Sequence, residues 1–225
     1  MLGGPRRAYL VLEFITLFIG LPVMVAIGLS EAHLLIVPVL LFAAALCLAL
    51  LLRDPSFDRS HVWNVSGLKN DLPRLAVMLA CTTLLLVATV MLTAAESFMD
   101  LPLNHPVIWL LILLFYPVIS VPPQELIYRV FLFHRYRELL TSPAMRIAAS
   151  ALVFCLAHLV FANILALILT LGGGLLFAYT YHRTQSLAAV SLEHALYGCL
   201  AFTVGIGNCL LYGTRLMMET LAGMA

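Results

Sequence analysis

Charged residues are scarce in this chain of 225 residues. Only 10% of the residues are Asp, Glu, Lys or Arg, whereas 63% are hydrophobic; a typical soluble domain has about 25% charged and about 45–50% apolar residues. A soluble fold of this size cannot hide so much apolar surface, which excludes an ordinary globular domain. The net charge is only +1 and the basic residues are scattered, so a nucleic-acid-binding surface is excluded as well. The chain is therefore expected to lie in a lipid bilayer.

Several common sequence motifs are also absent. The five cysteines form no CxxC pair and are read as small buried hydrophobes. No HExxH zinc motif occurs, and Gly172-Gly173-Gly174 lacks the Lys-Ser/Thr of a phosphate-binding loop. These small residues are expected to allow close helix packing instead. No internal repeat is visible, which argues against a proton-coupled transporter, although buried Glu and His would suit one.

Long apolar runs are what the sequence does contain. Runs of about 17–25 apolar residues predict membrane-spanning helices, so we expect an all-α polytopic membrane bundle of about eight transmembrane helices. The expected spans are 8–29, 34–52, 75–95, 107–121, 146–162, 164–181, 186–201 and 202–214. A further helix is expected over 122–140, opened by Pro122-Pro123. It either continues the fourth span after a kink or re-enters the membrane.

The positions of the basic residues predict an orientation. With eight spans, every Lys and Arg except Arg129 falls in the N-terminal tail, in loops 53–74, 134–146 and 182–185, or in the C-terminal tail. All of these segments lie on one face of the membrane. The positive-inside rule then predicts an integral, multi-pass protein with both termini in the cytoplasm. We expect one transmembrane domain over residues 1–225.

Ionisable residues inside the apolar runs are the candidates for chemistry. Glu125, His158 and His194 each interrupt such a run, and a charge at the bilayer centre costs roughly 2.5–3.5 kcal/mol on insertion scales. Arg129 follows Glu125 by four residues, so the two share a helix face and can pair. Two histidines and a carboxylate in a buried pocket can activate water.

Two further acidic residues lie in expected spans, and the sequence assigns them no role. Glu13 lies in the first span and is expected to pair with a neighbour. Glu193 adjoins His194 but projects about 100° away from it on a helix, so it is expected to support the site from behind.

Three short motifs in the second half of the chain resemble the CAAX-protease and bacteriocin-processing (CPBP, or Abi) family of intramembrane proteases. Gln124-Glu125-Leu-Ile-Tyr-Arg129 is similar to the family motif Glu-Glu-x-x-x-Arg. Phe154 to His158 matches Phe-x-x-x-His. His194 to Gly198 resembles a His followed four residues later by an Asn-like residue. The resemblance covers residues 105–212, which we treat as a family-like catalytic core.

The resemblance implies an intramembrane endopeptidase that cleaves membrane-associated or lipidated peptides. In the family the first glutamate of the first motif and the histidine of the second motif activate a water molecule, and Gln124 occupies that first position here. We therefore expect Glu125 and His158 to activate the water, His194 to stabilise or protonate the intermediate, and Arg129 to fix Glu125. No cofactor is required in this form. An alternative places zinc on Glu125, His158 and His194 with water as the open ligand.

Two departures from the family motifs leave a second function open. Gln124 stands where the family has a glutamate, and Gly198 has no side chain to bind an oxyanion. The amide of Gln124 is one candidate for the missing donor. Alternatively, the protein is a degenerate, non-catalytic scaffold or peptide-binding member of the same family.

Overall fold

The structure is a computed structural model that describes residues 4–28, 35–62 and 64–207. Within these ranges all regular elements are helical. Among the described residues, seven helical runs are long and apolar enough to cross a membrane: Gly4–Gly28, Ile36–Arg53, Val65–Thr93, Pro106–Arg135, Pro143–Phe161, Ile164–Thr184 and Leu187–Val204. The predicted all-α polytopic class is therefore confirmed.

These runs are divided into shorter elements by turns of tighter or wider helix. In chain order the elements are α1 (Gly4–Ile15), η1 (Thr16–Gly20), α2 (Leu21–Gly28), α3 (Ile36–Arg53), η3 (Arg59–Val62), α4 (Val65–Thr93), η4 (Ala95–Ser97), α5 (Asp100–Asn104), α6 (Pro106–Phe115), η5 (Tyr116–Ser120), α7 (Val121–Glu125), η6 (Leu126–Phe131), α8 (Leu132–Arg135), α9 (Pro143–Ala157), η7 (His158–Phe161), α10 (Ile164–Thr184) and α11 (Leu187–Val204). The elements η1, η5 and η6 are π-helical, whereas η3, η4 and η7 are 3₁₀ turns.

The predicted span 107–121 and the predicted helix 122–140 form one continuous helical run from α6 to α8. Of the two arrangements left open by the sequence, continuation of the fourth span is the one observed. Pro117, Pro122 and Pro123 lie in this run and have no N–H for the α-helical ladder. The π turns η5 and η6 accommodate such an interruption without breaking the helix.

Capping residues set two helix ends that differ from the prediction. α4 begins at Val65, earlier than the predicted residue 75, because Asn64 Oδ1 accepts from Gly67 N over 2.9 Å. α11 ends at Val204 because Gly205 adopts φ +106°, a left-handed conformation that favours glycine. The first three residues of the predicted span 202–214 thus form the last turn of α11, and residues 208–214 lie outside the described residues.

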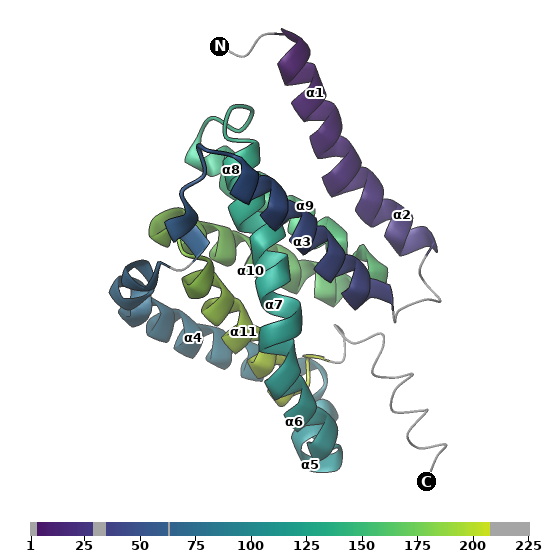
Figure 1. The fold of residues 1–225 in the computed structure, drawn as a ribbon. Coiled ribbons are helices and arrows are strands. Elements are labelled where there is room, and N and C mark those ends of the chain that lie inside the picture. The colour runs from purple at the N-terminus through teal and green to yellow at the C-terminus, as the bar shows by residue number, and fades with distance from the viewer. Residues whose placement is uncertain (1–3, 29–34, 63, 208–225) are drawn as a thin grey trace.

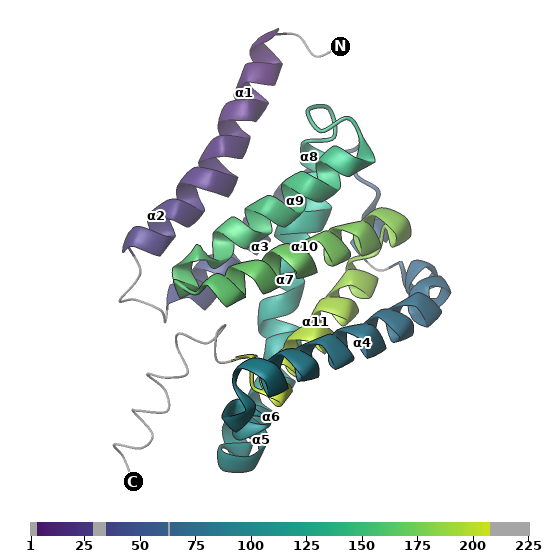
Figure 2. The same cartoon turned by 180° about the vertical axis from the view of Figure 1, so that it is seen from behind.

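The run from α6 to α8 passes through the middle of the bundle in both views (Figures 1 and 2). It contacts α3 on one side and α11 on another. α9 and α10 lie side by side, and α4 packs along α11. The buried core follows the same run, which contains the fully buried Val121, Val130 and Leu132. The central run therefore carries Glu125 and Arg129 into the interior.

The outer faces of the helices are apolar. Large hydrophobic side chains such as Leu92 at 86% and Ile27 at 76% relative exposure point away from the core. Contiguous exposed apolar surface on this scale suits contact with lipid tails rather than water.

Candidate active site

A carboxylate, a guanidinium and an imidazole meet inside the bundle. Glu125 ends α7, Arg129 lies in η6 and His194 lies in α11. Arg129 Nη1 donates to Glu125 Oε1 over 3.0 Å, and His194 Nδ1 lies 2.6 Å from the same oxygen. The Glu125 and Arg129 side chains are both 0% exposed. The four-residue spacing in the sequence thus produces a buried ion pair, and His194 joins it from a different helix.

Aromatic rings enclose this polar cluster. Arg129 Cζ lies 4.2 Å from the ring centroid of Phe154 and 5.4 Å from that of Phe177. The Phe177 ring also stacks on His194 with centroids 4.5 Å apart and an interplanar angle of 19°. A guanidinium over ring faces gains cation–π stabilisation, which is larger away from water. The rings therefore shield Arg129 and His194 from water, and Glu125 is itself 0% exposed, so the interactions within the cluster are strong.

The hydrogen bonds of His194 define its tautomer. Because Nδ1 faces the Glu125 carboxylate, which only accepts, Nδ1 carries the proton in the neutral ring. Nε2 then accepts from the Tyr116 hydroxyl, which lies 2.9 Å away. The result is a continuous chain from carboxylate through imidazole to phenol.

Tyr116 reaches His194 only because residue 198 is glycine. A Cβ atom placed on Gly198 would overlap the ring and hydroxyl of Tyr116, for example at 2.6 Å from Cζ. Gly198 is the position at which the family motif has an Asn-like side chain. In this protein the Tyr116 hydroxyl, from the central helical run, fills that space. Tyr116 was not predicted from the sequence. The glycine at position 198, where the family motif has an Asn-like side chain, was the feature that could have indicated that another residue fills this space.

His158 approaches the Glu125 network through Phe154 rather than by a hydrogen bond. Its Nδ1 lies 2.7 Å from the carbonyl oxygen of Phe154, so Nδ1 is the donor and Nε2 keeps its lone pair. Its ring packs on Phe154 with centroids 4.6 Å apart, and Phe154 also contacts the His194 ring at 5.6 Å. Among the described residues no hydrogen bond joins His158 to Glu125 or His194. The partly exposed His158 and the buried His194 therefore share Phe154 as a neighbour.

The amide of Gln124 is already engaged within its own helix. Gln124 Nε2 donates to the backbone oxygen of Ser120 over 3.1 Å and to its hydroxyl over 2.8 Å. Both amide hydrogens are thus used, and the predicted role of Gln124 as an oxyanion donor would need these bonds to break. The Tyr116 hydroxyl is a second donor in this region, and it is likewise engaged, with His194 Nε2.

The residues of the zinc alternative do not form a ready metal site. Within the described parts of the chain, no group of three or more His, Cys, Asp or Glu side chains is arranged to hold a metal ion. Both ring nitrogens of His194 contact protein groups. A metal on Glu125, His158 and His194 would therefore have to displace Glu125 or Tyr116 from that ring.

The two acidic residues without an assigned role both pair with arginine. Glu13 accepts from Arg135 Nη2 over 2.7 Å and from the Tyr136 hydroxyl over 2.9 Å. Glu193 accepts from the Tyr197 hydroxyl over 3.3 Å and lies 3.7 Å from Arg74 Nη1. Glu193 contacts α4 rather than Glu125, so both carboxylates connect helices outside the candidate active site.

The fold and the buried polar cluster define the class of this protein as a polytopic membrane protein with ionisable groups in its core. Residues 105–200 match the model of a family described as type II CAAX prenyl endopeptidase Rce1-like. The matched segment includes Tyr116, Glu125, His158 and His194, and the match confirms the predicted resemblance to the CAAX-protease family. No curated protein and no solved structure matched the chain.

Proposed function

We propose that the protein is a membrane endopeptidase that hydrolyses a peptide bond with a water molecule activated by Glu125 and His158. The observation that supports the proposal best is the buried chain from Glu125 through His194 to the Tyr116 hydroxyl. This chain holds a carboxylate, a base and a hydrogen-bond donor in fixed positions, as acyl-transfer chemistry requires.

The first step needs a base and a group that orients water. Among the described residues, neither His158 Nε2 nor Glu125 Oε2 has a hydrogen-bond partner. A water molecule held by these two groups attacks the peptide carbonyl carbon and transfers one proton to His158. The C–O bond forms and the carbonyl oxygen becomes an oxyanion.

The second step needs donors for the oxyanion and an acid for the leaving amine. Tyr116 has a single hydroxyl proton, which it donates to His194 in the resting state and to the oxyanion in the intermediate. His158 then gives its proton to the amine nitrogen as the C–N bond breaks. The remaining proton of the water stays with the new carboxyl group.

The substrate class follows from the family resemblance and the apolar exterior. We propose a peptide bound at the membrane, directly or through an attached lipid, and cut close to its C-terminus or at a leader junction. The bilayer would hold such a substrate next to the helices, which raises its local concentration at the site.

Cleavage of a fluorogenic prenylated peptide by the purified protein in vesicles tests this function. We expect His158→Gln to lower the rate by about 10²–10⁴-fold, the usual contribution of a general base. Tyr116→Phe is expected to lower it by about 10²–10³-fold, as for the loss of one oxyanion donor. Tyr128→Phe is the matched control, since it removes a hydroxyl from the same helical run without touching His194.

The melting temperature separates a chemical effect from unfolding. Glu125→Gln leaves the buried Arg129 with a weaker partner and is expected to lose stability as well as activity. Tyr116→Phe and His158→Gln are expected to melt near the parent value. Cleavage at the parent rate by both of these variants would contradict the proposed mechanism.

A second function, peptide binding without cleavage, is favoured by Gln124 alone. This neutral side chain stands at the family's first glutamate and is bonded to Ser120. A parent protein that binds the labelled peptide yet forms no product would support this function. In that case Gln124→Glu is expected to gain cleavage.

A further inference from the structure

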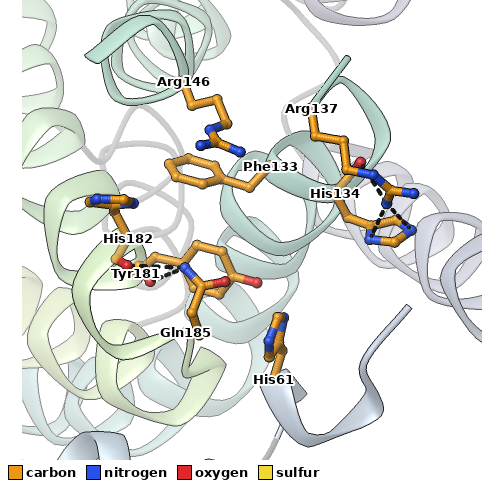
Figure 3. A pocket seen from close by; sticks show the side chains of 8 residues that line it. All are labelled: His61, Phe133, His134, Arg137, Arg146, Tyr181, His182 and Gln185. Atoms are coloured by element: carbon orange, nitrogen blue, oxygen red, sulfur yellow. Dashed lines mark hydrogen bonds between the residues drawn. The ribbon is translucent and has the colours of Figure 1, made fainter. Parts of the chain in front are cut away.

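A cavity of about 310 Å³ lies where η3, α8, α9 and α10 come together. Eight side chains line it: His61, Phe133, His134, Arg137, Arg146, Tyr181, His182 and Gln185. Figure 3 shows these side chains around the cavity, with Arg146 and Arg137 on one side and His61 on the opposite side. None of the eight belongs to the Glu125 network, so the cavity is a separate feature of the molecule.

The lining is rich in positive and titratable groups. It contains two guanidinium groups and three imidazoles, and it contains no carboxylate. The nearest acidic partners are directed to individual histidines: Asp54 lies 2.9 Å from His134, and Asp58 lies 3.8 Å from His61. The cavity itself is therefore a place where an anion would be stabilised.

Arg146 is the group whose hydrogen bonds are incomplete. Its Nε atom is buried and has no hydrogen-bond partner among the described residues. A buried donor without an acceptor is destabilising, and more so when the group is charged. Arg137, by contrast, is held in place by Ser56 Oγ at 2.9 Å and by the His134 ring. One arginine is thus prepositioned and the other lacks an acceptor.

We propose that this cavity binds a phosphate group. Planar guanidinium forks match the oxygens of phosphate and bind it through charge-assisted hydrogen bonds. The volume is at the lower limit of ligand pockets, which are about 300–1,000 Å³, and suits a headgroup rather than a whole cofactor. The cavity lies at the end of the helices that carries the basic loops, where pockets between membrane helices meet the headgroups of anionic lipids.

The phosphate can come from a lipid headgroup or from a free anion, and two arms of one experiment distinguish these sources. The purified protein in neutral detergent is titrated with inorganic phosphate in one arm and with dioctanoyl phosphatidylglycerol in the other. The melting temperature is measured at constant ionic strength, because screening weakens charge interactions. Dioctanoylglycerol, which has no phosphate, is the control for the lipid chains.

We expect phosphatidylglycerol to raise the melting temperature of the parent and dioctanoylglycerol to leave it unchanged. Arg146→Gln is expected to weaken the apparent affinity at least tenfold. Arg59→Gln is the matched control, since Arg59 is an exposed cation near the same end of the helices that does not line the cavity. It is expected to bind as the parent does.

Each outcome decides the proposal. A rise in melting temperature with the lipid, or with inorganic phosphate alone, supports a phosphate site and identifies the source of the phosphate. This holds provided that Arg146→Gln weakens the apparent affinity more than Arg59→Gln does. Equal weakening by the two variants would show a general surface-charge effect and overturn the proposal. Protection by neither inorganic phosphate nor phosphatidylglycerol would also overturn it. The assay does not depend on peptide cleavage, so its result is independent of the proposed function.

Discussion

At the scale of single residues, Gly198 and Tyr116 share one volume in the centre of the bundle. The absent side chain of one residue makes room for the ring of the other, and that ring brings a hydroxyl to His194. The hydroxyl lies 2.9 Å from His194 Nε2, on the side of the imidazole opposite Glu125. The polar cluster is therefore completed by a residue from outside the three family motifs.

Gly198→Ala is expected to displace Tyr116 and to lower stability by about 1–3 kcal/mol, the usual cost of overpacking a core. The melting temperature measures the loss of stability. The rate of peptide cleavage measures the loss of the hydroxyl contact. Combining Gly198→Ala with Tyr116→Leu should restore much of the lost melting temperature, because leucine is smaller than tyrosine and frees space. Cleavage should stay low in the double variant. Unchanged melting of Gly198→Ala alone would show that the two residues do not compete for space.

His61 is expected to make stability depend on pH. Burial lowers the pKa of His61 below its usual value, His134 lowers it further, and Asp58 acts in the opposite direction. The unfolded chain binds this proton near pH 6.5, whereas the folded protein binds it only at lower pH. Stability is therefore lost as the pH falls below about 6.5 toward the folded pKa. His61→Asn is expected to reduce the difference in melting temperature between pH 7.5 and pH 5.5.

His105→Asn is the control for this measurement, because His105 lies at the opposite end of the molecule and outside the cavity. Asp54 does not interfere in this range. Hydrogen bonds from Ser56 and His134 lower the Asp54 pKa, so its contribution is lost only in more acidic solution, below the ordinary Asp value of about 3.9. Identical pH dependence in His61→Asn and the parent would exclude His61 as the source.

At the scale of elements, the contact between α9 and α10 depends on small residues. A Cβ atom on Gly174 would lie 3.0 Å from Ala151 Cα, whereas one on Gly172 would meet nothing within 4 Å. The backbone oxygen of Gly174 also accepts from Arg129 Nη2 over 3.4 Å. The glycine run therefore permits close packing, as the sequence predicted, but only part of the run does so.

Gly172→Ala and Gly174→Ala form a matched pair with opposite expected signs. Alanine is favoured over glycine inside a helix by about 0.5–1 kcal/mol, so Gly172→Ala should raise the melting temperature. Gly174→Ala gains the same helix preference but presses on Ala151, which belongs to a packed backbone, and should lower it. A rise in both variants would show that α9 and α10 separate without cost.

The sequence predicts helices well in this protein because apolar length alone identifies a membrane span. The ends of the helices were less predictable, since they depend on capping contacts such as that of Asn64 to Gly67 N. The pairing of Glu125 with Arg129 is local and follows from spacing. The contact of Glu125 with His194 and the insertion of Tyr116 beside Gly198 are not local, so no periodicity in the sequence indicates them.

At the scale of the whole molecule, the basic segments gather at one end. Arg6 pairs with Glu138 at 3.2 Å, and Asn64 Nδ2 donates to Thr184 O over 2.9 Å. His134 likewise lies 2.9 Å from Asp54. These contacts join the N-terminal helix and the loops that follow α3, α8 and α10. The charge pattern assigned these loops to the same side of the membrane. The fold does bring them to one common face.

Cysteine labelling tests the prediction that this face is cytoplasmic. Thr141→Cys places an exposed thiol between α8 and α9 at the basic end, and Ala95→Cys places one beyond α4 at the other end. A membrane-impermeant maleimide should modify Thr141→Cys only in sealed inside-out vesicles and Ala95→Cys only in right-side-out vesicles, because positive loops stay in the cytoplasm. The parent protein measures the background from its own cysteines. The reverse pattern would place the phosphate-binding cavity on the outer face. Labelling of both positions from one side would contradict a membrane crossing by the run from α6 to α8.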